Sequence, residues 1–107
     1  MKKKFKFPDG FFWGASTSAP QVEGGNNNDW SGWGAGRACD HYHRFGGDFD
    51  IAKELNHNAH RFSIEWSRIE PKEGRIDEKE IEHYHQVVRA LKERGLEPFV
   101  TLCHFTL

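Results

Sequence analysis

The chain has 107 residues, enough for one small domain, and a formal charge of −1. Such a balance does not indicate a nucleic acid or an anionic membrane surface as a partner, and no window approaches the roughly 20 apolar residues of a membrane span. Two distant cysteines, Cys39 and Cys103, without a signal-like apolar stretch near the start, predict free thiols in a cytoplasmic protein.

The predicted elements in the first half alternate between strand and helix. An aromatic-rich run from Phe11 to Ala15 follows a Pro-Asp-Gly turn and predicts the first strand. Residues 24–47 are rich in Gly, Asn, Asp and Ser and predict a loop. A second strand is expected from Asn58 to Ile64. Between this loop and the second strand, the segment from Asp48 to Leu55 predicts a short amphipathic helix. Its packing residues are Phe49, Ile51, Ala52 and Leu55.

The second half carries the clearest helix signal. Asp77 is a good N-cap, and Glu80 stands where a capping box places its carboxylate. Gly95 predicts the end of this helix, and Leu96 to Leu102 then predicts a third strand, with an almost continuous apolar run typical of strands buried on both faces. The apolar residues at helical spacing are Ile81, Tyr84, Val87, Val88 and Leu91.

The order of these elements predicts an α/β fold with parallel strands, because the connections between strands are long enough for crossovers. Three strands do not close a (β/α)8 barrel, which takes about 250 residues. A small autonomous three-stranded α/β domain is therefore one possibility, and a portion of a larger domain is the favoured one.

Three segments resemble a known family, in the same order. Phe7 to Gly24 (FPDGFFWGASTSAPQVEG) resembles the opening of family 1 glycoside hydrolases, the β-glucosidase and β-galactosidase group. Asn58 to Pro71 (NAHRFSIEWSRIEP) resembles their second strand, and Leu96 to Leu107 (LEPFVTLCHFTL) resembles their third. The resemblance implies that residues 1–107 are the N-terminal portion of a single glycoside hydrolase domain, a partial TIM (β/α)8 barrel with about its first three strands.

The resemblance also implies a retaining β-glycosidase, in which two Glu carboxylates flank the glycosidic bond. In the family these lie in an Asn-Glu-Pro motif after the fourth strand and a Thr/Ser-Glu-Asn-Gly motif after the seventh. Neither motif occurs here, so we expect no catalytic residue in the chain and no activity from it alone. Glu23, Glu65 and Glu70 are predicted to be hydrogen-bonded or exposed carboxylates, since nothing in the sequence makes two of them converge on a sugar.

Matched positions assign part of a sugar-binding site. Gln21 matches the family glutamine whose amide, as donor and acceptor, binds two sugar hydroxyls. His104 matches a hydroxyl-binding histidine just past the third strand, and Phe105 stands where many members have Trp, so it keeps an apolar wall without an indole N–H. Arg61 matches the arginine that pairs with the nucleophile and would keep it ionised; a structural ion pair with another carboxylate is its alternative role.

Two rival functions fit parts of the sequence. The segment Cys39 to His43 clusters four possible metal ligands, but their spacing matches no common zinc signature. His83 and His85 are two positions apart on a predicted helix and should point to different faces. A non-catalytic carbohydrate-binding module is the other rival, and it would use the same glutamine, histidine and aromatic residues.

The expected partner is thus a small-molecule carbohydrate, a β-glycoside, with no cofactor and no metal. The motifs do not distinguish glucosides from galactosides. The remaining aromatic candidates for stacking on sugar rings are tryptophans for which packing is the favoured role: Trp30, Trp33 and Trp66.

Overall fold

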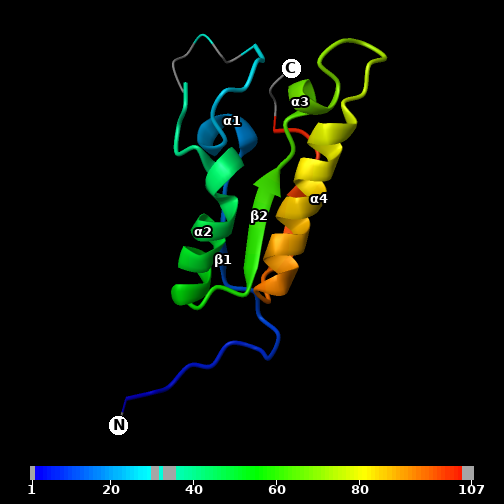
Figure 1. Cartoon of the computed structure of the whole chain (residues 1–107). Helices are drawn as coiled ribbons and strands as arrows, with labels where there is room; N and C mark the ends of the chain where they lie inside the picture. The colour runs from blue at the N-terminus through cyan, green and yellow to red at the C-terminus, as the bar shows by residue number, and fades with distance from the viewer. Residues whose placement is uncertain (1, 30–31, 33–35, 105–107) are drawn as a thin grey trace.

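The structure, a computed structural model, describes residues 2–29, 32 and 36–104 (Figure 1). Trp30, Trp33 and Phe105 therefore lie outside the described residues. The elements in chain order are β1 (Gly14–Ser16), α1 (Ala19–Val22), α2 (His41–Glu54), β2 (Ala59–Ser63), α3 (Trp66–Ile69), α4 (Glu78–Glu93) and β3 (Glu97–Thr101).

The strands form one parallel sheet in the order β1-β2-β3, as predicted. β2 and β3 lie within a residue or two of their predicted bounds. The first strand begins later than the sequence predicts: β1 starts at Gly14, and the aromatic residues before it are exposed. Those rings pack on one another instead, with centroids 4.6 Å apart for Phe7 and Trp13 and 4.9 Å apart for Phe11 and Trp13.

The second helix is longer than the sequence predicts, because α2 begins at His41 inside the expected loop. Gly46 and Gly47 lie within it and lower its intrinsic helix propensity, which hid its first half. Tertiary packing overrides that preference through Phe49, which is 1% exposed. Two of the predicted packing residues are on the other side: Ile51 is 56% exposed and Leu55 is 65% exposed.

The helix α4 confirms its predicted N-cap, since Asp77 Oδ1 accepts from the backbone N–H of Lys79 at 3.0 Å. The prediction of a capping box between Asp77 and Glu80 is wrong. The Glu80 carboxylate accepts a hydrogen bond from the Tyr42 hydroxyl at 2.8 Å, and the Asp77 N–H donates to the Ile69 carbonyl. Gly95 ends the helix with φ of +70°, a conformation that suits glycine.

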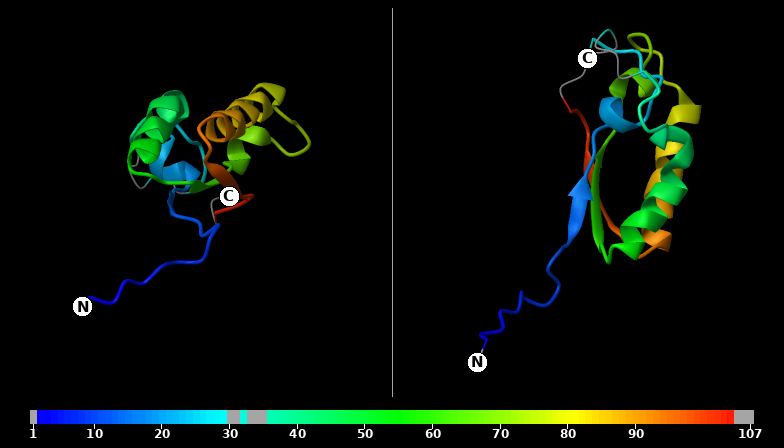
Figure 2. Two further views of the ribbon diagram at one scale, coloured as in Figure 1. Left: turned by 90° about the horizontal axis from the view of Figure 1, so that it is seen from below. Right: turned by 90° about the vertical axis from the view of Figure 1, so that its left-hand side faces the viewer.

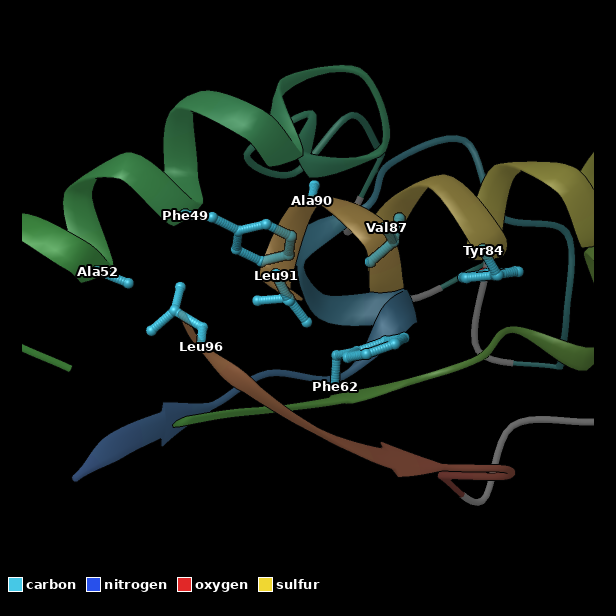
Figure 3. Packing of buried hydrophobic residues seen from close by; sticks show 8 residues of the cluster. All are labelled: Phe49, Ala52, Phe62, Tyr84, Val87, Ala90, Leu91 and Leu96. Atoms are coloured by element: carbon cyan, nitrogen blue, oxygen red, sulfur yellow. The ribbon is translucent and has the colours of Figure 1, made fainter. Parts of the chain in front are cut away.

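The hydrophobic core lies between the two long helices and one face of the sheet (Figure 3). Leu91 is fully buried and Val87 is 3% exposed, so the predicted apolar stripe of α4 is the central packing surface. The buried residues of this core are Phe49, Ala52, Phe62, Tyr84, Val87, Ala90, Leu91 and Leu96.

Among the described residues, no helix covers the opposite face of the sheet, because α2 and α4 both lie on the same side (Figure 2). The prediction that the third strand is buried on both faces is therefore wrong for this chain: Phe99 and Val100 are each 43% exposed. The one-turn helices α1 and α3 were not predicted. In the part of the chain that the structure describes, no helix is long and apolar enough to cross a membrane.

Candidate functional site

The carboxyl ends of the parallel strands form one edge of the sheet, where α1 and α3 lie (Figure 1). Gln21 is in α1, directly after β1; Arg61 is in β2; and His104 follows the end of β3. The entry into α1 is fixed to the end of β2, because the Ala19 N–H donates to Ser63 Oγ at 2.8 Å. The fold thus brings Gln21, Arg61 and His104 to the carboxyl ends of the strands, where parallel α/β sheets carry their binding sites.

The side chain of Gln21 is exposed. Its amide is oriented from behind by Ser18, whose hydroxyl donates to Oε1 at 2.6 Å. Ser18 itself is 1% exposed, so the donor side of this contact is shielded from water. The remaining lone pair of Oε1 and the NH2 group are the parts of the amide that a ligand can use.

Arg61 reaches the same edge and contacts His104 directly. Its Nη2 lies 2.9 Å from His104 Nδ1, its Nε donates to Thr101 Oγ1 at 2.8 Å, and its Nη1 donates to the Thr17 carbonyl at 3.4 Å. No carboxylate pairs with this guanidinium among residues 2–29, 32 and 36–104. The alternative role, a structural ion pair, is therefore not what the described residues show.

A buried network fixes the segment that follows Gln21. Glu23 is 4% exposed, its Oε1 accepts from Arg68 Nε at 3.1 Å, and the Tyr84 hydroxyl lies 2.8 Å and 3.0 Å from its two oxygens. Arg68 also donates to the carbonyl of Gly24, where φ is +86° and a Cβ would meet the Arg37 carbonyl. Glycine is required at that position, and Arg68 joins α3 to the loop after α1.

The electrostatics of this network are set by burial. Burial raises the pKa of the Glu23 carboxyl, and the hydrogen bond from Tyr84 and the charge of Arg68 oppose that effect. Burial likewise raises the pKa of the Tyr84 hydroxyl, and the nearby Glu23 charge adds to it. Tyr84 stays a neutral donor to Glu23 while it accepts from the Glu65 N–H at 3.0 Å.

Arg68 is held further by an aromatic stack. Its guanidinium carbon lies 4.1 Å from the centroid of the Tyr42 ring, and the His83 ring stacks on Tyr42 at 3.8 Å with an interplanar angle of 17°. Burial, helped by the charge of Arg68, lowers the pKa of His83 to about 4, so this ring is neutral in the stack. His85 is exposed on the opposite side of α4, which confirms that the two histidines face different ways.

The other carboxylates have the structural roles expected of them. Glu65 is fully buried and accepts from Asn28 Nδ2 and Ser67 Oγ, each at 3.1 Å. Glu70 accepts from the Gly74 N–H at 2.6 Å. Trp66, for which packing was favoured, is 53% exposed at the start of α3, so that expectation is wrong for this chain.

The segment Cys39 to His43 is tied together by local contacts. Asp40 Oδ1 lies 2.7 Å from His43 Nδ1, and His41 Nδ1 lies 2.7 Å from Asp48 Oδ2. Within the described residues no group of three or more His, Cys, Asp or Glu side chains is placed to hold a metal ion. Cys39 and Cys103 are both exposed.

Sequence reasoning missed the residues that orient the assigned ones, namely Ser18, Thr101 and Arg68. Ser18 and Thr101 act through one hydroxyl each and Arg68 through its guanidinium, and the contacts of Thr101 with Arg61 and of Arg68 with Glu23 join positions 40 or more residues apart. Only Arg68 had a signal in the sequence. It closely follows an apolar strand, where a buried guanidinium needs a carboxylate partner, and Glu23, two positions after Gln21, is a candidate for that partner.

Comparison with known proteins identifies the family of this chain. The sequence profile of Glycosyl hydrolase family 1 matches residues 3–107. Beta-glucosidase A of Thermotoga maritima is 37% identical over 120 residues, which cover 95% of this chain and 27% of that protein. The structure of a beta-glycosidase from Pyrococcus horikoshii superposes with a TM-score of 0.89 at 40% identity, covering 95% of this chain and 26% of the other.

A second structure shows a ligand in a relative. The beta-glucosidase from Thermotoga maritima in complex with a methoxycarbonyl-substituted glucoimidazole superposes with a TM-score of 0.85 at 35% identity, covering 95% of this chain and 28% of that one.

A parallel sheet with helices on one face and polar side chains at its carboxyl edge is, with these matches, part of an α/β barrel of the glycosidase class. The expected partial barrel is confirmed. The chain belongs to glycosyl hydrolase family 1. It spans about a quarter of the length of the relatives that it matches.

Proposed function

We propose that this chain supplies part of the sugar-binding site of a retaining β-glycosidase, as the N-terminal portion of a single barrel domain. The observation that supports the proposal is the joint placement of Gln21, Arg61 and His104 at the carboxyl edge of the sheet. In barrel enzymes this edge carries the active site. The catalytic carboxylates would come from segments beyond these residues, because neither carboxylate motif occurs in the sequence.

Each residue has a defined part in this proposal. The Gln21 amide would bind vicinal hydroxyls of the non-reducing sugar, and His104 would bind a further hydroxyl. Phe105 would supply an apolar wall beside that sugar. Arg61 would hold the nucleophile ionised and aimed, since no carboxylate among residues 2–29, 32 and 36–104 forms a salt bridge with its guanidinium. A cytoplasmic location stays a proposal, supported by the presence of only two cysteines, far apart in the sequence.

The experiment is a graft in which residues 1–107 replace the matching segment of the Thermotoga maritima beta-glucosidase A. We expect the graft to hydrolyse 4-nitrophenyl β-D-glucopyranoside and the isolated chain to show no hydrolysis above background. Hydrolysis by the isolated chain that follows the purified polypeptide and disappears in Glu65→Gln would refute the proposal, and so would a folded graft without activity.

Within the active graft, Gln21→Ala and His104→Ala are each expected to lower kcat/KM roughly 10- to 150-fold. Each substitution removes about 1.5–3 kcal/mol of transition-state stabilisation, because sugar hydroxyls are left unpaired in a desolvated site. The matched controls are Gln86→Ala and His85→Ala, which truncate exposed side chains of the same kinds on α4 and should change kcat/KM less than twofold. An unchanged kcat/KM in Gln21→Ala would remove that residue from the site.

A further inference from the structure

The contact between Arg61 and His104 fixes which nitrogen of the histidine ring carries the proton. A guanidinium has five N–H donors and no acceptor, and its group stays protonated in proteins. At 2.9 Å from Arg61 Nη2, His104 Nδ1 can only accept. An accepting Nδ1 has no proton, so a neutral ring in this arrangement carries its proton on Nε2.

Arg61 is suited to impose that choice because its own position is over-determined. Nε is held by the Thr101 hydroxyl at 2.8 Å, and Nη1 points to the Thr17 carbonyl at 3.4 Å. These contacts come from β3 and from the segment after β1, so two parts of the chain outside β2 hold one planar group. A rotation of the Arg61 guanidinium away from His104 would therefore also break its hydrogen bonds with Thr101 and Thr17.

We propose that Arg61 is a positioning residue for His104: it holds the ring as the Nε2–H tautomer, so that His104 presents a hydrogen-bond donor and selects an acceptor oxygen on the ligand. The ligand part of this inference rests on the proposed function, in which His104 binds a sugar hydroxyl. It adds a second role for Arg61 to the one proposed toward the nucleophile. The tautomer itself is independent of any sugar.

The first test is the ring nitrogen spectrum of ¹⁵N-histidine-labelled protein at about pH 8, where free histidine is neutral. It is recorded on the isolated chain and on the graft, and the His104 signals are assigned by their loss in His104→Gln. We expect a single Nε2–H tautomer for His104 in whichever sample is folded, and a mixture of both tautomers in Arg61→Met.

Thr101→Val is the matched control, since it removes one hydrogen bond to the same guanidinium without touching the Nη2 contact and should keep the Nε2–H tautomer. A mixed or Nδ1–H tautomer in the parent overturns the inference, and this observation needs no variant to fold. An unchanged His104 spectrum in Arg61→Met overturns it as well, because the ring would then hold its tautomer without Arg61.

The second test measures whether His104 donates a hydrogen bond to an acceptor atom of the ligand, and at which ring position. Inhibition constants of the graft are determined for glucose and for its single deoxy and deoxyfluoro analogues at ring positions 2, 3, 4 and 6. Fluorine accepts a hydrogen bond weakly and cannot donate one, so at the hydroxyl read by His104 the fluoro analogue should inhibit at least threefold better than the deoxy analogue. This advantage should disappear in His104→Ala; its absence at every position in the parent graft overturns the selection of an acceptor.

A graft without activity but with the expected tautomers refutes the proposed function and leaves the role of Arg61 supported.

Discussion

Replacing Glu23 by alanine is expected to lower the free energy of unfolding by about 3–5 kcal/mol, because it leaves a buried cation without its carboxylate. The side chain of Arg68 is 15% exposed, and that of Glu23 is 5% exposed, so water cannot replace the lost partner. The Tyr84 hydroxyl loses its acceptor in the same step. The loss is a large part of the stability of a typical domain. The measurement is guanidinium-induced unfolding of the graft, read as the difference between variant and parent.

The design separates the buried pair from carboxylate loss in general. Glu82→Ala, on the exposed side of α4, is the matched control and should stay within about 0.5 kcal/mol of the parent. The double variant Glu23→Ala with Arg68→Met should cost clearly less than the sum of the two single substitutions, because it removes both charges together. A single-variant loss below about 1 kcal/mol, or strict additivity, would show that the pair is not a coupled buried unit.

The buried pair of Glu23 and Arg68 also holds the segment that carries Gln21. Glu23 and Gln21 belong to one short segment, and the Arg68 contacts with Glu23 and the Gly24 carbonyl hold that segment against α3. Ser18 holds the other side of Gln21. The exposed amide is thus placed between two anchored positions, which reduces the conformational freedom of this segment.

The elements that sequence reasoning placed well are those whose signals are local. In α4 the apolar spacing, the Asp77 cap and the Gly95 stop all agree, and the helix lies where they predict. The start of α2 was missed because Gly46 and Gly47 argue against a helix locally, whereas Phe49 is fixed by contacts with the rest of the core. The aromatic run before β1 resembles a strand in composition, but its rings pack on one another.

For the site, matched motifs identified Gln21, Arg61 and His104 as candidates, and the fold brings them to one edge. The contacts among them were not predictable in the same way. Whether Arg61 meets His104 depends on the register of β2 with β3, in which Arg61 pairs with Phe99. A shift of one residue would send the guanidinium to the other face of the sheet, and the sequence contains no direct record of that register.

The isolated chain is expected to be poorly folded and to self-associate through the uncovered face of its sheet. β2 has a strand neighbour on each side, whereas β1 and β3 each have only one in the described part of the chain. Phe99 pairs with Arg61, one position out of phase with the core residue Phe62, so it points away from the helices and is 43% exposed beside Phe12 at 5.2 Å. Unpaired strand edges and an apolar face are both sites of association.

Sedimentation velocity and near-UV circular dichroism on the purified chain measure this. We expect concentration-dependent oligomers with weak aromatic signals, and Phe99→Lys should shift the distribution strongly toward monomer by placing a charge on the open face. The matched control is Ile51→Lys, at a residue 56% exposed on α2, which should leave the association unchanged because that helix surface already faces water. A parent chain that is monomeric, with a sharp aromatic signal and cooperative melting, would show that the three strands form a domain by themselves. The proposal that they need the rest of a barrel would then have to be withdrawn, because a sheet that is stable with one bare face has no need of further strands to cover it.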